Sequence, residues 1–328
     1  MNAIARNPEA ATGDASAMAA AFVAAHRERA SRLGRDLAEL VDDPEAFAAT
    51  LREGLACLAD PAFLAAAARL APGTGPLAGV RTPLQAAIRN SFSRATRRDR
   101  PDALLWLAER LLREELMEAR WFAIGLTTRL LASDPERSWQ LLRRAAHAAA
   151  DWVTVDILAH PYGRGILAEP YRWAELEQLV YAPSRWERRL VGSTLATLPY
   201  LDRVAGRRPE VAGRSLALVG ELIGDAEADV QRALAWALRS LTLVDPTAVG
   251  RFCAAEADRA ARTGDGYRAW VVRDALSKLE PGLAARLRAR LTGIRRPVGR
   301  PATSNAALAA RRFLGGIPGA AELAEAPL

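Results

Sequence analysis

A proline recurs at a nearly constant interval through much of this 328-residue chain, and this interval constrains the fold more than any other feature. The intervals are 34, 35, 39, 37 and 35 residues, between Pro101, Pro135, Pro170, Pro209, Pro246 and Pro281. Proline is tolerated in the first turn of a helix, where its missing N–H would have no intrahelical partner. Each proline is therefore expected to open a repeating helical unit, and Asp134 and Asp245 precede two of them as side-chain caps.

The residues between the prolines follow the period of an α-helix. Across residues 17–293 apolar side chains recur at i, i+3, i+4 and i+7, and period-two stretches rich in Val, Ile and Thr are absent. A unit of this length holds two helices and a turn, which is typical of HEAT-like repeats. We therefore predict an all-α fold, a HEAT-like helical-repeat solenoid with a concave basic face. Coincidental prolines in a generic helical bundle are the alternative.

Composition divides the chain into three parts. We expect a flexible N-terminus at residues 1–14, a single all-α HEAT-like repeat domain at residues 15–285 and a basic C-terminal tail at residues 286–328. Between residues 286 and 316 there are eight arginines and no acid. Residues 297–301 are similar to the core of a minor-groove AT-hook, but a solvated basic tail is the simpler interpretation.

The charge balance favours an anionic partner. Lys and Arg outnumber Asp and Glu by 45 to 38, a net charge of +7, and Lys278 is the only lysine. Cys57 and Cys253 lie far apart, and no histidine has the spacing of a metal site. No apolar run approaches the roughly 18 residues of a membrane span. We therefore expect a cytoplasmic protein without metal or cofactor.

The expected second helix of each unit carries one polar residue at a similar depth. Counted from the opening prolines, these residues lie 19 to 23 positions on, at Arg120, Asp156, Arg189, Arg232 and Arg268. Equivalent positions in a stacked solenoid line one face, usually the one that binds. Four arginines and one aspartate predict an anion-binding face, whereas a protein-binding scaffold would show apolar or acidic residues there.

Trp152 and Asp156 are at positions i and i+4, so a helix projects an aromatic face and a carboxylate side by side. Such a pair stabilises a cation through the ring quadrupole and through the negative charge. Trp186 and Arg189 have a similar spacing in the next unit, and Trp236 lies in the unit after that. An ordinary amphipathic helix with a buried tryptophan and a salt-bridged aspartate would explain the first pair equally well.

Five segments in this order resemble the HEAT-like-repeat DNA glycosylases of the DNA alkylation repair family. The resemblance spans about residues 79–251, outside the expected N-terminal helices at residues 15–78, and its segments are residues 79–83, 118–121, 151–156, 184–190 and 230–239. It implies a duplex-DNA repair enzyme that excises N3- and N7-alkylated purines without inserting the base into a deep pocket.

The resemblance also implies roles for single residues. Asp156 matches the catalytic aspartate, Trp152 and Trp236 match two tryptophans that face DNA, and Arg189 matches a phosphate-contacting arginine. We expect further phosphate contacts, which fix register without reading sequence, from Arg188, Arg232, Arg268 and Arg120. The family often has Trp-Trp-Asp where this chain has Asp-Trp-Val at residues 151–153, which leaves the substrate range open.

The leading hypothesis is a monofunctional alkylpurine DNA glycosylase that acts as a monomer at the nucleoid. Lys278 lies outside the matching stretch, so Schiff-base strand cleavage has no obvious nucleophile. The alternative is a non-catalytic HEAT-like protein that binds damaged or branched DNA. The presence of Asp156 between two tryptophans favours the enzyme.

Overall fold

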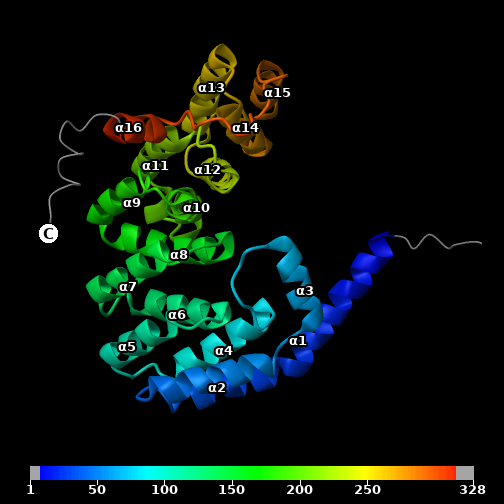
Figure 1. The fold of residues 1–328 in the computed structure, drawn as a ribbon, viewed down its shortest axis with the longest axis vertical. Coiled ribbons are helices and arrows are strands. Elements are labelled where there is room, and N and C mark those ends of the chain that lie inside the picture. Colours follow the sequence, from blue (N-terminus) through cyan, green and yellow to red (C-terminus); the bar gives the residue numbers. More distant parts are fainter. Residues whose placement is uncertain (1–7, 315–328) are drawn as a thin grey trace, which may run out of the picture. The chain divides into compact units, whose positions relative to one another are not determined.

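The fold of the described residues is all-α, as the sequence predicts. A computed structural model describes residues 8–314, with side chains described for residues 15–311, and it contains no strand within that range. Figure 1 shows its helices and short 3-10 turns, which are α1 (Pro8–Ala38), α2 (Pro44–Ala56), α3 (Pro61–Leu70), α4 (Thr82–Ala95), α5 (Pro101–Leu111), α6 (Met117–Leu130), α7 (Pro135–His147), α8 (Trp152–Ala168), η1 (Pro170–Arg172), α9 (Trp173–Leu179), α10 (Arg185–Leu201), η2 (Ala205–Arg207), α11 (Pro209–Leu222), α12 (Ala228–Leu241), α13 (Pro246–Thr263), α14 (Gly266–Ala275), η3 (Leu276–Lys278), α15 (Pro281–Arg290) and α16 (Asn305–Leu314).

The six regularly spaced prolines each begin a helical element, as predicted. Five open α5, α7, α11, α13 and α15, and Pro170 opens the turn η1 that leads into α9. The Asp245 side chain accepts a hydrogen bond from the Ala248 N–H at 2.7 Å, which is the expected cap of α13. In five of these repeats a second helix follows, which is α6, α8, α10, α12 or α14. The fold is therefore a helical-repeat solenoid.

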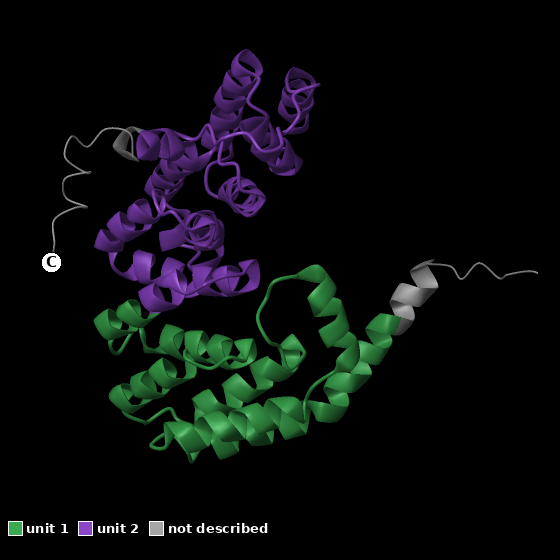
Figure 2. Ribbon diagram, in the orientation of Figure 1, with its two compact units in different colours: residues 1–141 green, residues 142–328 purple. Residues whose placement is uncertain are grey.

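The chain forms two compact units, residues 1–141 and residues 142–328 (Figure 2). The division falls inside α7, within the stretch that the sequence assigns to one domain. Residues 1–7 of the predicted flexible N-terminus lie outside the described residues, and α1 begins at Pro8. The sequence-based domain boundaries otherwise stay a prediction.

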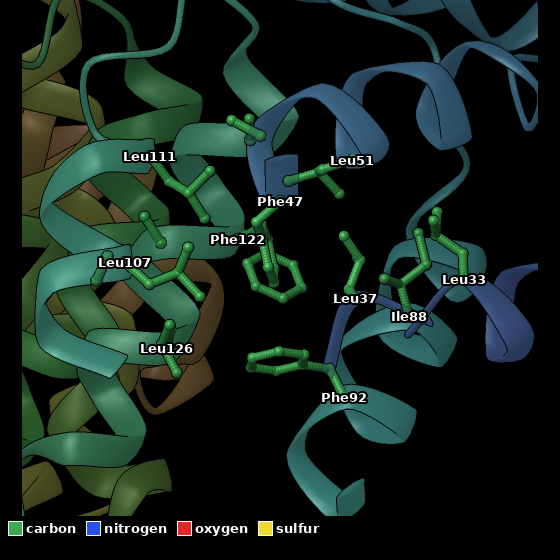
Figure 3. Packing of buried hydrophobic residues seen from close by; sticks show 14 of the residues in the cluster. Leu33, Leu37, Phe47, Leu51, Ile88, Phe92, Leu107, Leu111, Phe122 and Leu126 are labelled. Atoms are coloured by element: carbon green, nitrogen blue, oxygen red, sulfur yellow. The ribbon is translucent and has the colours of Figure 1, made fainter. Parts of the chain in front are cut away.

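Three phenylalanine rings lie at the centre of the first unit (Figure 3). The Phe92 ring centroid lies 5.6 Å from that of Phe47 and 5.3 Å from that of Phe122, and both pairs are edge-to-face. Such pairs add about 0.5–1.5 kcal/mol each to the burial of apolar area. The cluster joins α2, α4 and α6, so it fixes the packing of three helices that are distant in sequence.

Two of the segments singled out in the sequence meet in this unit. The Glu118 carboxylate is buried and accepts hydrogen bonds from the backbone N–H groups of residues 78, 79 and 80. Glu118 therefore satisfies the loop before α4, which would otherwise bury three unpaired donors. These two segments have a structural role here.

In the compact unit of residues 142–328, the second helices of successive repeats (α8, α10, α12 and α14) pack directly on one another. Helix α10 contacts both α8 and α12, and α12 contacts α14. After α15 the chain passes back to α16, which contacts α11 (Figure 1). We call residues 294–304 the strap. The predicted boundary of the basic tail at residue 286 falls inside α15, and the strap is hydrogen-bonded to the second unit. Within residues 8–314 no helix is long and apolar enough to cross a membrane.

Removing the central ring of the aromatic cluster should destabilise the first unit. Phe92 is 1% exposed, and Phe92→Ala should lower the free energy of unfolding by about 3–5 kcal/mol, because it removes apolar contacts and leaves a cavity. Urea denaturation followed by circular dichroism measures the change. Trp106→Ala is the control, since Trp106 is 57% exposed, and equal losses in the two variants would contradict this view of the core.

Candidate functional site

The first turn of α8 is set by Asp151. This buried N-cap residue accepts hydrogen bonds from the Thr154 backbone N–H at 2.9 Å and the Thr154 hydroxyl at 2.7 Å. Trp152 thereby becomes the first residue of the helix, and Asp156 follows one turn later on the same side. The departure of this segment from the Trp-Trp-Asp pattern therefore places a capping carboxylate at the helix start.

The Asp156 carboxylate is held by two side chains of α10. Arg189 Nε donates to Asp156 Oδ1 at 3.2 Å, and Arg189 Nη2 donates to Asp156 Oδ2 at 2.8 Å. The buried Ser193 hydroxyl also donates to Asp156 Oδ1, at 2.7 Å. A two-pronged guanidinium contact fixes the plane of a carboxylate as well as its position. The carboxylate orientation is therefore set before any ligand binds.

Arg189 also joins α10 to α12. Its Nη1 donates to the Asp229 carbonyl oxygen at 2.8 Å, and the Asp229 carboxylate in turn lies 3.4 Å from Arg232 Nη1. The Arg189 guanidinium carbon lies 5.8 Å from the centroid of the Trp152 ring. Two aspartates and two arginines thus alternate across α8, α10 and α12, and one arginine lies against a tryptophan face.

Exposure separates the roles of these groups. The Asp156 side chain is 24% exposed and that of Arg232 is 62% exposed, whereas that of Arg189 is only 7% exposed. Trp236 is partly exposed and follows Arg232 by one turn on α12. The carboxylate of Asp156 and the guanidinium of Arg232 can therefore be reached from solvent. The Arg189 guanidinium, predicted to contact phosphate, is instead enclosed by protein groups.

Position within each helix explains which predicted residues come together. Asp156, Arg189 and Arg232 are each the fifth residue of their helices, and the fifth residue of α14 is Trp270. We call Asp156, Arg189, Arg232 and Trp270 the fifth-position row. Helices α8, α10, α12 and α14 pack on one another in this order, so we expect equal positions to share a face.

Arg268 is the third residue of α14, and two residues turn a helix by about 200°. Its side chain is 1% exposed and pairs with Asp265 at 3.2 Å and with Glu256. A guanidinium buried between two carboxylates cannot reach a phosphate. The structure therefore gives no support to the predicted DNA contact of Arg268, which stays untested.

Arg188 also has a structural role. Its Nε donates to the buried Asp225 carboxylate at 2.7 Å, and its Nη1 donates to the carbonyl oxygens of Ala182 and Pro183 at 2.9 and 2.8 Å. These contacts join the loop before α10 to the loop before α12. These contacts give no support to the predicted phosphate contact of Arg188, which stays untested.

Arg120 belongs to the first unit, where it is the fourth residue of α6. Its Nε donates to the backbone carbonyl of Glu114, and its side chain is partly buried. This contact gives no support to a DNA-contacting role.

His160 follows Asp156 by one turn of α8. Partial desolvation lowers the pKa of His160, and the positive charge of Arg164 lowers it further, while Asp156 opposes both effects. The imidazole is therefore uncharged at neutral pH. It adds no positive charge to this face.

Ser193 and Asp229 belong to the site, but the sequence analysis did not name them. Ser193 lies one turn after Arg189, and Asp229 lies three residues before Arg232. Residues three or four positions apart lie on the same face of a helix. The positions i±3 and i±4 around Arg189 and Arg232 therefore include Ser193 and Asp229. In the described residues no group of three or more His, Cys, Asp or Glu side chains is arranged to hold a metal ion.

Two of three comparisons with known proteins found a match. The profile of the family described as DNA alkylation repair enzyme matches residues 51–279. A solved structure, a predicted DNA alkylation repair enzyme from Enterococcus faecalis, is similar with a TM-score of 0.52 and 16% sequence identity. That similarity covers 72% of this chain and 97% of the other. No curated protein matches the sequence.

The burial of Arg268 can be tested by stability. Arg268→Ala should lower the free energy of unfolding by about 3–5 kcal/mol, because it leaves the Asp265 and Glu256 carboxylates without their partner. Arg232→Ala, at the exposed arginine, should cost less than about 1 kcal/mol. Urea denaturation of the two variants measures both values. A small loss for Arg268→Ala would return this residue to the candidate ligand contacts.

Proposed function

The chain belongs to the family of DNA alkylation repair enzymes, and from this premise we propose that it is a monofunctional DNA glycosylase. Its substrates are N3- and N7-alkylated purines in duplex DNA, and it hydrolyses their N-glycosidic bonds. It works as a monomer at the nucleoid, without a metal ion or cofactor. The observation that carries the proposal is the partly exposed Asp156 carboxylate, held by Arg189 and Ser193.

The chemistry needs a fixed negative charge. An N3- or N7-alkylpurine is cationic, so its glycosidic bond is weak and the base leaves as a neutral molecule. The sugar left behind has oxocarbenium character, as in glycoside hydrolysis. Asp156 stabilises this developing cation and orients the attacking water. No general acid is required, because the leaving base needs no proton.

Arg189 and Ser193 act as positioning residues. Their three hydrogen bonds hold both oxygens of the Asp156 carboxylate in one plane. A carboxylate that is already oriented needs no reorganisation when charge develops on the sugar, which is the main source of electrostatic stabilisation in active sites. The buried position of Arg189 fits this role better than a direct phosphate contact.

Two tryptophans complete the proposed site. The Arg189 guanidinium lies over the face of the Trp152 ring, which shows that this ring is placed to interact with a cation. We propose that Trp152 and Trp236 lie against the deoxyribose and the cationic base. The exposed Arg232, one turn before Trp236, binds a phosphate beside them.

The direct experiment is incubation with duplex DNA that carries a site-specific N7-methylguanine or 3-methyladenine. Alkaline treatment cleaves the strand at each abasic site, so excision appears as a shorter labelled strand. Cleavage that requires the alkaline step supports a monofunctional glycosylase, and the absence of excision from both lesions would overturn the proposal. The rate without enzyme is the baseline, because these cationic bases also leave slowly unaided.

The ion pair between Asp156 and Arg189 favours one alternative. A guanidinium at 2.8 Å offsets part of the carboxylate charge, which suits a non-catalytic protein that binds damaged or branched DNA. That alternative predicts binding to lesion-bearing or branched duplex with no excision of either methylated base. The same incubation, run beside a binding measurement, separates the two functions.

Asp156→Asn preserves the shape of the side chain but removes its charge. The single-turnover excision rate at saturating enzyme should fall by about 10²–10³-fold, with little change in DNA affinity. Asp229→Asn is the matched control, because it removes the other carboxylate beside Arg189 and should slow excision far less. Equal excision by the parent and by Asp156→Asn would remove the catalytic role.

Arg232→Ala tests the phosphate contact. The dependence of log affinity on log salt concentration should lose about one unit of slope on damaged and undamaged duplex alike, since each phosphate contact releases about one counterion. Arg214 is the matched control, an exposed arginine on α11 that pairs with Glu177 as Arg232 pairs with Asp229. An unchanged slope for Arg232→Ala would assign the residue to the ion-pair network alone.

A further inference from the structure

The strap, residues 294–304, lies outside the family match at residues 51–279, yet it packs on the same unit as Asp156. Thr303 N donates to the Gly224 carbonyl oxygen at 2.8 Å, and the Thr303 hydroxyl donates to the Asp265 carboxylate at 2.5 Å. The Tyr267 hydroxyl donates to the Arg300 carbonyl oxygen at 2.6 Å. The strap is thereby attached to the loops that precede α12 and α14 (Figure 1).

Two glycines make room for the strap. Gly266 lies so close to the Arg295 carbonyl oxygen that any Cβ would collide with backbone atoms. Gly224 has a φ of +105°, and a Cβ there would lie 2.6 Å from the Thr303 hydroxyl oxygen. Both positions therefore need glycine for backbone packing against the strap. The strap is a built part of the second unit.

The strap carries positive charge without acids. Its side chains Arg295, Arg296 and Arg300 are exposed, and between Glu280 and Glu322 the sequence contains no acidic residue. Among the residues that the structure describes, contacts with acidic side chains come from Thr303 and, next to the strap, Asn305. No acid among the described residues therefore pairs with the exposed strap arginines.

One strap arginine lies beside the fifth-position row. The Arg296 guanidinium carbon lies 5.7 Å from the centroid of the Trp270 ring, which is the row's member on α14. Arg296 Nη1 also donates to the side-chain oxygen of Gln231 at 3.3 Å, and Gln231 directly precedes Arg232 on α12. The strap thus places the guanidinium of Arg296 next to Trp270 and close to the segment of α12 that carries the exposed Arg232.

We propose that the strap is a second binding surface for the phosphodiester backbone of duplex DNA. The strap binds phosphates of the duplex that flanks the lesion, through Arg295, Arg296 and Arg300. The stretch around Arg232 binds the phosphates beside the lesion. This inference rests on the proposed function for the identity of the ligand. It adds a contact that the repeats alone do not supply, and its attachment to the loops before α12 and α14 means that the arginines are already in place before DNA binds.

The test is the double variant Arg295→Gln and Arg300→Gln, which leaves the Arg296 contacts and the backbone hydrogen bonds of the strap unchanged. Affinity for undamaged duplex is measured as a function of salt concentration. On a duplex of about 30 base pairs the salt slope should fall by about two units, because two phosphate contacts are lost.

The matched control is Arg203→Gln with Arg208→Gln. These exposed arginines lie beyond the C-terminal end of α10, whereas Arg189 lies near its N-terminal end, so the control removes the same charge elsewhere. An unchanged slope in the strap variant, or an equal fall in the control, would overturn the proposal.

A labelled strap gives a second measurement. Val298 is 97% exposed, so Val298→Cys in a Cys57→Ser background accepts a fluorophore, while burial raises the pKa of Cys253 to about 12 and leaves that thiol unreactive. Undamaged duplex should change the fluorescence at low salt and lose this effect at high salt. Fluorescence that does not respond to duplex would overturn the proposal.

Failure of the proposed function gives a different result. Binding to undamaged duplex does not depend on excision, so a salt slope that falls in a protein without glycosylase activity would retain the strap and reject the enzyme. Excision by the parent protein, together with an unchanged salt slope in the strap variant, would retain the enzyme and reject the strap as a DNA-binding surface. At saturating concentration the strap variant should excise at the parent rate, because the strap does not contact the Asp156 carboxylate.

Discussion

The contact between Asp156 and Arg189 is the interaction on which the second unit depends. It joins α8 to α10, and the same guanidinium reaches the α12 backbone at Asp229, so one side chain joins three helices. A buried arginine is costly unless its donors are paired, and here the donors that face α8 and α12 are used. The same pairing that lowers this cost also orients the carboxylate. Packing and the proposed chemistry therefore share one group.

Much of this could be predicted from residue spacing. Proline at a nearly constant interval located the starts of the helix pairs from α5 onwards, because its effect on a helix start is local and does not depend on the rest of the fold. The pairing of Trp152 with Asp156 on one side of α8 followed from helix geometry in the same way. Such features need only the periodicity of one helix.

The partners of the arginines could not be predicted in this way. Arg188, Arg232 and Arg268 look equivalent in the sequence, but their roles depend on which acid the fold brings near. Counting from the prolines also left an uncertainty of four residues, which exceeds one helical turn. Counting from the true start of each second helix distinguishes a residue at the fifth position, such as Asp156, from one at the third, such as Arg268. That start depends on capping residues such as Asp151 and Asp265.

The strap has a consequence for how this protein folds. In a plain repeat array each unit contacts only its neighbours, so the ends can unravel one repeat at a time. Here Thr303 bonds to Gly224 across 79 residues, and Asn305 bonds to Glu221 across 84. These long-range closures link α11 and α12 to the end of the array, so that its last repeats lose their structure together. Their formation requires the intervening chain to fold first, which makes this end of the protein slower to form and more cooperative than a linear stack.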